Sequence, residues 1–288
     1  MRARLDPDLL AALLTDAAGR RLWIAYSGGL DSHVLLHAAA GLRERLQLDL
    51  CAVHIHHGLL PDADAWTAHC ARVCAELGVS LSVRRLALRP GAGASLEAVA
   101  REARYAAFRA LLQPGERLAT AQHRDDQAET LLLALLRGAG VHGLAAMPAR
   151  APLGAGVLLR PFLALPRTAL ADYAEAHGFA WVEDPSNADL AHDRNRLRHA
   201  VIPLLRERWP ALDRTLARSA AYCAEAAELL DASADELLAG LAADLPNALS
   251  IRRLRTLDDA RRRLVLRRWL RRQGLPLPDS DRLRLIVD

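Results

Sequence analysis

The 288-residue chain contains no lysine, so all 38 of its basic side chains are arginines. This absence excludes Schiff-base enzymes, ligases that carry AMP on a lysine, and nucleotide-binding loops that end in Gly-Lys-Ser/Thr. Long hydrophobic runs are also missing, because Arg, Asp and Gly interrupt the apolar stretches, which predicts no membrane-spanning segment and no membrane partner. The first residues, MRARLDP, lack the apolar core of a secretory signal, so we expect a cytoplasmic protein.

Cysteine and net charge limit the functions further. The four cysteines form no Cys-x-x-Cys pair, so they predict neither a disulfide framework nor a metal cluster. The net charge is only +4, but ten arginines and two aspartates lie between Arg252 and Arg272. Such a run is usually a solvated helix face. Beside other nucleic-acid signals it is a candidate phosphate-binding surface.

Short apolar runs alternate with longer helical patterns over the first part of the chain. Apolar residues recur at helical spacing over residues 34–46 and 96–111, and strands are expected over residues 22–26, 50–55, 81–88 and 117–121. This alternation predicts an α/β fold, doubly wound, with a mostly parallel sheet covered by helices on both faces. Ligands of such folds bind at the carboxyl ends of the strands, where Ser27, His56 and His123 fall.

The pattern changes around Pro203 and Pro210. Residues 211–244 are rich in alanine and helical throughout in their pattern, and an arginine-rich helical stretch follows. We therefore expect two domains. The first, residues 1–210, carries the sheet, and the second, residues 211–288, is smaller and mainly helical.

A glycine-containing loop joins the first expected strand to a helix. Its residues are Ser27, Gly28, Gly29, Leu30, Asp31 and Ser32. Successive backbone amides in such a loop, together with the positive end of the helix, form a site for phosphate oxygens. Asp31 cannot bind phosphate directly, but it suits Mg²⁺ that bridges the phosphates. The alternative is an ordinary strand-to-helix turn with Ser32 as the helix cap.

Acidic residues gather where a later helix begins, just after an expected strand end. Asp125, Asp126 and Glu129 lie in ATAQHRDDQAETLLLALLRG, residues 119–138, and Asp126 and Glu129 share one face of the first helical turn. Paired acids at this place suit Mg²⁺ or an ammonium group. The alternative is that acidic residues only favour the positive end of the helix.

Three further stretches carry polar side chains of interest. Arg101, Arg104 and Tyr105 share one polar face of a helix, although Glu97 and Arg101 also fit a plain surface pair. The run Arg194-Asn195-Arg196-Leu197-Arg198 mixes guanidinium and amide donors that suit RNA phosphates and base edges, with a solvated helix start as the alternative. The stretch HIHHG, residues 54–58, has no acid or cysteine at ligand spacing, so structural or nucleotide contacts are favoured over zinc.

Taken together, these stretches resemble the tRNA(Ile)-lysidine synthases, which are N-type PP-loop ATP pyrophosphatases. The resemblance runs in the family's order through SGGLDS, HIHHGL, EAVAREARY, ATAQHRDDQAETLL, RGAGVHGLAAM, RPFL and EDPSN…RNRLR…P. It covers residues 20–205 closely and implies a Rossmann-like PP-loop ATPase domain. The set of motifs is far more specific than any one of them.

The resemblance implies a reaction and its substrates. ATP would adenylate the C2 carbonyl oxygen of the wobble cytidine in the isoleucine tRNA with a CAU anticodon. The ε-amino group of free L-lysine would then attack C2, release AMP and leave lysidine. A PP-loop tRNA thiolase and a non-catalytic module that binds RNA or nucleotides remain the alternatives, and a homodimer is left open.

The resemblance also implies roles for individual residues. Asp126 and Glu129 fall on the family's acidic motif, which is assigned to the lysine or the metal. From the chemistry of the reaction we expect Asp31, Asp126 and Glu129 to be catalytic, with Asp31 and Asp126 as Mg²⁺ ligands and Glu129 as the partner of the substrate lysine. ATP would bind to residues 27–32, from Ser27 to Ser32. Contacts to tRNA would come from Arg101, Arg104, Arg194, Asn195 and Arg198.

Overall fold

The structure, a computed structural model, describes residues 5–58, 62–86, 96–243 and 247–287. The chain divides into two compact units, one formed by Met1–Gly138 with Ala146–Arg218 and the other by Ala139–Ala145 with Ser219–Asp288. In the described part of the chain, none of the helices has both the length and the apolar character that crossing a membrane requires.

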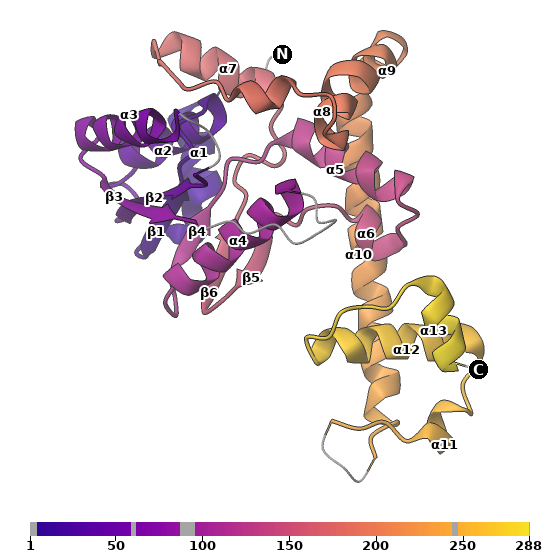
Figure 1. Ribbon diagram of the computed structural model, residues 1–288. Coiled ribbons are helices and arrows are strands. Elements are labelled where there is room, and N and C mark those ends of the chain that lie inside the picture. The colour runs from indigo at the N-terminus through magenta and orange to yellow at the C-terminus, as the bar shows by residue number, and fades with distance from the viewer. Residues whose placement is uncertain (1–4, 59–61, 87–95, 244–246, 288) are drawn as a thin grey trace. The chain divides into compact units, whose positions relative to one another are not determined.

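The first unit contains a six-stranded sheet in the order β3-β2-β1-β4-β6-β5 (Figure 1). Its strands are β1 (Arg21–Ala25), β2 (Asp49–His56), β3 (Ser80–Arg85), β4 (Arg117–Ala119), β5 (Arg150–Leu153) and β6 (Gly156–Leu159). Neighbouring strands are parallel except for β5, which runs antiparallel to β6. The expected mostly parallel α/β fold is therefore confirmed.

Two details of the sheet differ from the expectation. The strand expected over residues 117–121 ends at Ala119, and the strand expected over 81–88 ends at Arg85, with residues 87 and 88 outside the described part of the chain. The hairpin of β5 and β6 gives no clear signal in the sequence. Each of its strands has only four residues, and proline and glycine interrupt the surrounding stretch.

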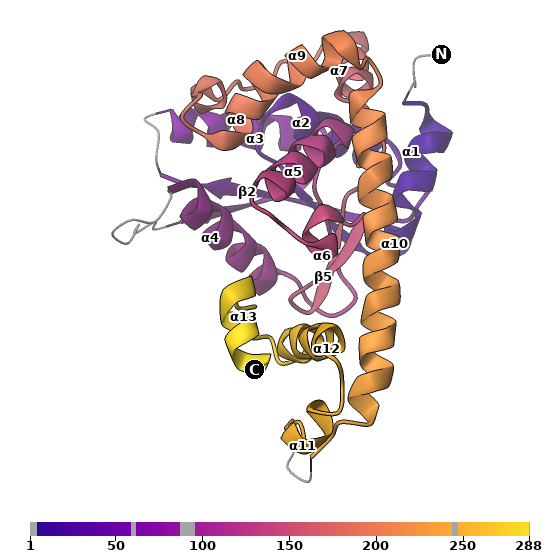
Figure 2. The same cartoon turned by 90° about the vertical axis from the view of Figure 1, so that its right-hand side faces the viewer.

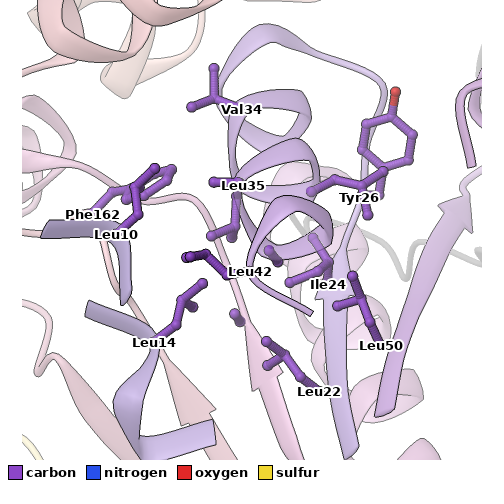
Figure 3. Packing of buried hydrophobic residues seen from close by; sticks show 14 of the residues in the cluster. Leu10, Leu14, Leu22, Ile24, Tyr26, Val34, Leu35, Leu42, Leu50 and Phe162 are labelled. Atoms are coloured by element: carbon purple, nitrogen blue, oxygen red, sulfur yellow. The ribbon is translucent and has the colours of Figure 1, made fainter. Parts of the chain in front are cut away.

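Helices cover both faces of the sheet. Successive side chains of β1 point to opposite faces, and apolar side chains on both faces need to be covered. Leu22 and Ile24 are fully buried in the core formed with α1 (Pro7–Leu14), α2 (Leu30–Gly41), α3 (Ala63–Glu76) and α7 (Arg167–Ala176) (Figure 3). The intervening Trp23 packs on the other face in a cluster with Phe108 of α4 (Leu96–Leu111). Figure 2 shows α4 on the opposite side of the sheet from α2 and α3.

The remaining elements of the first unit carry the polar residues of the second half of the sequence. They are α5 (Arg124–Leu136), α8 (Asp193–Arg196), a π-helical turn (Leu197–Val201) and α9 (Ile202–Arg208). The long helix α10 (Leu212–Ala239) runs from the first unit into the second. The second unit also contains α6 (Val141–Leu144), α11 (Ile251–Leu254), α12 (Asp259–Arg272) and α13 (Ser280–Val287).

Candidate active site

The loop between β1 and α2 needs glycine at position 28 for two reasons. Gly28 has a φ of +88°, in the left-handed region that residues with a Cβ rarely adopt. A Cβ at this position would also lie 3.1 Å from the Cys70 Sγ and 3.6 Å from a methyl group of Val182. The carbonyl of Gly28 accepts a 2.9 Å hydrogen bond from the Val182 amide, so the segment before residue 184 lies directly against the loop.

The two serines close the loop on itself and leave other donors available. The Ser27 and Ser32 hydroxyl oxygens are 3.0 Å apart, the Gly29 amide donates to Ser27 Oγ, and Ser32 Oγ donates to the Gly29 carbonyl. The amides of Leu30 and Asp31, at the start of α2, donate to no acceptor in the described part of the chain. Free amides at the positive end of a helix are donors for phosphate oxygens.

We expect Gly28→Ala to weaken nucleotide binding because the loop must shift. Gly19→Ala is the matched control: Gly19 has a φ of +66°, but a Cβ there meets nothing within 4 Å. The left-handed backbone costs each variant about 1–2 kcal/mol of unfolding free energy, measured by urea denaturation. Only Gly28→Ala should also lose nucleotide affinity, measured by calorimetry. Equal affinities of the two variants would contradict this reading of the loop.

Acidic groups from the loop and from α5 converge on a buried histidine. His123 follows β4 and caps α5, and its side chain is only 3% exposed. Its Nε2 lies 3.7 Å from Asp31 Oδ2 and 3.4 Å from Asp126 Oδ2, and its Nδ1 lies 3.7 Å from Asp125 Oδ2. Burial lowers the pKa of His123, but the nearby carboxylate of Asp31 and the charges of Asp126 and Asp125 outweigh burial, so this pKa is raised. The cluster therefore joins the two expected acidic motifs in one place.

Asp31 has the free oxygen that a metal ligand needs. Its Oδ1 is buried and accepts no hydrogen bond from the described residues, and the Arg167 Nε atom lies 3.8 Å away. Asp126, in contrast, accepts hydrogen bonds at both oxygens, from the His123 amide at 3.0 Å and from Arg198 at 3.0 Å. The described residues contain no group of three or more metal-binding side chains. Mg²⁺ is commonly held by one or two carboxylates together with substrate phosphates, and Asp31 fits that pattern.

Glu129 is a buried carboxylate held by two arginines. Arg198 donates from Nε to Glu129 Oε1 at 2.7 Å and from Nη2 to Oε2 at 2.9 Å, while Arg194 Nε lies 3.8 Å from Oε2. Burial raises the pKa of Glu129; the hydrogen bond and charge of Arg198 oppose this rise and Asp126 adds to it, and the net direction is upward. The π-helical turn at Leu197–Val201 carries Arg198 to the same carboxylate that Arg194 approaches.

Sequence reasoning missed two residues, Arg206 and Arg167, that hold Asp125 of α5 in place. Arg206 donates to Asp125 Oδ1 at 2.6 Å and also pairs with both oxygens of Asp213 at 2.8 Å. The backbone amide of Arg167 donates to Asp125 Oδ2 at 2.9 Å. The two hydrogen bonds to Asp125 join residues 42 and 81 positions apart in the sequence, so no local motif indicated them.

The other residues expected to bind tRNA lie in different settings. Asn195 is buried and donates to the carbonyls of Ser186 and Asp189, so its amide shapes the loop after residue 184. Arg101 is exposed on α4, with its guanidinium 5.3 Å from the centre of the Tyr105 ring. Arg104 is half-buried on the same helix.

The positive charge of Arg104 affects the pKa of His57, a histidine of the HIHHG stretch that lies just beyond the end of β2. Burial, followed by the positive charge of Arg104, lowers the pKa of His57 to about 4, so this imidazole is neutral at physiological pH. Its Nδ1 is buried without a hydrogen-bond partner among the described residues. The expectation that HIHHG makes structural or nucleotide contacts stays a prediction.

The fold and the loop define a PP-loop nucleotide-binding protein, and comparisons with known proteins agree. The family model described as the PP-loop domain matches residues 6–205, and the model described as the TilS substrate binding domain matches residues 249–288. A solved U34-tRNA thiolase from Methanococcus maripaludis, with its 4Fe-4S cluster, has a similar fold, with a TM-score of 0.61 and 14% identity over 74% of this chain and 76% of that one.

Curated relatives refine this class. A tRNA(Ile)-lysidine synthase from Methylococcus capsulatus is 49% identical over 98% of this chain and 64% of its own length, and one from Alkalilimnicola ehrlichii is 51% identical over 97% and 62%. The chain belongs to the tRNA(Ile)-lysidine synthase family. It spans less than two thirds of the length of these relatives.

Proposed function

We propose that this chain carries out lysidine synthesis on the isoleucine tRNA with a CAU anticodon, with ATP and free L-lysine as the other substrates. The observation that carries the proposal is the convergence of Asp31, from the phosphate-binding loop, with Asp126 and the neighbouring Glu129 around His123 and Arg198. A nucleotide-activating loop and an acidic site for a cationic substrate are the two parts that this reaction needs. We also propose that residues 1–210 form the catalytic domain and that residues 211–288 form a second, helical domain.

In the first step, the loop residues 27–32 would hold ATP with its α-phosphate exposed to the base. The C2 carbonyl oxygen of the cytidine forms a bond to the α-phosphorus as the bond to pyrophosphate breaks. Asp31, and on our proposal Asp126, would hold Mg²⁺, which offsets phosphate charge when bound. The hydroxyls of Ser27 and Ser32 and the amides at the start of α2 would orient the phosphates.

In the second step, the neutral ε-amine of lysine bonds to C2, the C–O bond to AMP breaks, and the amine loses a proton. We propose Glu129 as the residue that positions lysine. Because Arg198 already engages both oxygens of Glu129, a lysine ammonium group must share this carboxylate with the guanidinium or displace it. Proximity to the Arg198 charge favours loss of a proton from the amine, and the neutral amine is the form that attacks.

The proposal is tested by incubating the protein with ATP, Mg²⁺, the isoleucine tRNA and isotope-labelled lysine. We expect label at the wobble position of the anticodon and none in a tRNA whose wobble cytidine is replaced by uridine. Incorporation of sulfur from a sulfide donor in place of lysine would point to a thiolase. Tight tRNA binding without any base change would point to a non-catalytic module.

The thiolase alternative has little chemical support in this chain. Burial raises the pKa of Cys70 to about 12 and that of Cys74 to about 11, so both thiols stay protonated at physiological pH. Cys51 is also buried, and burial raises its pKa. Thiols of this kind are poor nucleophiles and poor metal ligands, because both roles need the thiolate.

We expect Arg194→Ala to weaken tRNA binding and to reduce its salt dependence, because fewer counterions are released when the protein neutralises fewer phosphates. The logarithmic salt slope should fall by roughly 0.7–0.9 for each phosphate that is no longer neutralised. Arg194 is preferred to Arg198 for this test because its hydrogen bond goes to a neutral acceptor, Thr130 Oγ1 at 3.0 Å, and it approaches Glu129 only at 3.8 Å. The salt slope of Arg101→Ala, on α4, is measured in the same way for comparison with that of Arg194→Ala. An unchanged slope with weaker ATP binding would assign Arg194 to the nucleotide.

A further inference from the structure

The strongest unassigned feature of the proposed site is the His123 side chain, which lies between two carboxylates from different motifs. Asp31 belongs to α2 and Asp126 to α5, and the imidazole Nε2 is within 3.7 Å of an oxygen of each. Two carboxylates facing each other without a donor between them repel, and each would turn toward solvent. The side chain of Asp126 is fixed by other donors, whereas Asp31 lies near its neighbours His123 and Arg167 only at 3.7 and 3.8 Å.

The other ring nitrogen of His123, Nδ1, caps the helix α5. The backbone amide of Asp126 donates to His123 Nδ1 at 3.4 Å, and the His123 amide donates to Asp126 Oδ2 at 3.0 Å, which together form a capping box at the start of α5. Because Nδ1 accepts this hydrogen bond, we assign a proton to Nε2, on the side of the ring that faces Asp31. One nitrogen therefore stabilises the helix and the other faces the loop carboxylate.

We propose that His123 is a positioning residue that holds Asp31 Oδ2 inward, so that Asp31 Oδ1 is presented to the magnesium–nucleotide complex. The buried Oδ1, which accepts no hydrogen bond from the described residues, is the oxygen left for that ligand. His123 itself touches no substrate. The inference rests on the proposed function for the identity of the nucleotide, and it assigns a role that the acidic motif alone does not indicate.

Two substitutions separate the tasks of the two ring nitrogens. His123→Asn keeps an acceptor at the place of Nδ1, and asparagine is a good helix cap, but its side chain is too short to reach Asp31. His123→Gln has an amide that reaches the place of Nε2 but lacks the acceptor that caps the helix. His123→Asn should keep the stability of the parent and lose the orientation of Asp31. His123→Gln should keep the orientation of Asp31 and lose stability.

The measurement is the affinity of the full chain for an ATP analogue that has a methylene group between the α- and β-phosphorus atoms. The affinity is measured by calorimetry at several Mg²⁺ concentrations. His123→Asn should bind the analogue about tenfold more weakly than the parent and need more Mg²⁺, because the imidazole N–H that faces the Asp31 carboxylate at 3.7 Å is removed. His123→Gln should bind within about threefold of the parent but unfold at lower urea concentration. Arg167→Gln is the control for the cation near Asp31, and the half-exposed 3.8 Å ion pair of Arg167 predicts a smaller effect.

Parental affinity of His123→Asn, or equal losses in His123→Asn and His123→Gln, would overturn the inference. The outcome is separable from that of the proposed function, because analogue binding needs neither tRNA nor lysine. If the parent makes lysidine and His123→Asn binds normally, only the role of His123 is wrong. If the parent binds the analogue but makes no lysidine, the proposed function fails, and the comparison of the two variants still decides the role of His123.

Discussion

Replacement of Asp31 by alanine is expected to abolish AMP formation while leaving the fold intact. Asp31 carries the carboxylate of the phosphate-binding loop, and its Oδ1 accepts no hydrogen bond from the described residues. Loss of the ligand that organises charge on the transferring phosphate should lower the rate by at least about a hundredfold. Folding should be little affected, because the side chain is 32% exposed and its ion-pair distances are 3.7 and 3.8 Å.

The measurement is single-turnover release of AMP in the presence of tRNA and lysine, with urea denaturation as the test of folding. Ser27→Ala is the matched control, since it removes a hydroxyl from the same loop but leaves the amides at the start of α2 as phosphate donors. It should weaken ATP binding only mildly. AMP release by Asp31→Ala near the parental rate would show that Asp31 does not organise the metal.

Replacement of Arg198 by alanine is expected to destabilise the protein strongly as well as impair lysine use. The side chain of Glu129 is 2% exposed, and Arg198 supplies hydrogen bonds to both of its oxygens. Removal of Arg198 leaves this buried charge without a hydrogen-bonded partner and with only Arg194, 3.8 Å away, which costs about 3 kcal/mol. Arg198→Ala/Glu129→Gln is the control, because it removes the buried charge together with its partner. It should recover most of the lost unfolding free energy.

The loss of unfolding free energy in Arg198→Ala should increase as the pH rises. The pKa of Glu129 in the folded protein is already raised, mainly by burial, and loss of Arg198 raises it further. Below the ordinary glutamate pKa the carboxyl is protonated in both the folded and the unfolded state, so the ionisation of Glu129 adds nothing to the loss of unfolding free energy. As the pH rises through the raised pKa, the folded protein must ionise a buried acid, so the deficit grows. Urea denaturation at about pH 5 and about pH 8 should show the larger deficit at the higher pH. A deficit that is equal at both values, or larger at acid pH, would contradict this account.

Much of the architecture was predictable because local signals and the strand-end rule agree. Two glycines between a short apolar run and a helical pattern indicated the loop at residues 27–32, and β1 and α2 flank it as expected. The acids of α5 were predictable for a similar reason, because they follow a strand that pairs with β1 in parallel. The short hairpin of β5 and β6 was not, because four residues carry too little periodicity.

The polar partners of the acids depend on tertiary packing that no local pattern records. Arg198 was expected to bind RNA, and in the structure its guanidinium lies on Glu129, 69 residues earlier in the sequence. Its role toward tRNA remains a prediction. Likewise, Arg206 reaches Asp125 across 81 residues. His123 was expected at the carboxyl end of a strand, but only the fold places its ring between Asp31 and Asp126.

The order of bond formation tests the central claim most directly. The parent protein is mixed with tRNA, Mg²⁺ and ATP labelled at the α-phosphate, first without lysine and then with unlabelled lysine added. We predict that label accumulates on the tRNA at the wobble cytidine without lysine, and that lysine releases it as AMP while a lysine-bearing nucleoside appears. Label found on lysine instead of on the tRNA, or no transfer to the tRNA until lysine is added, would contradict activation of the base by this site.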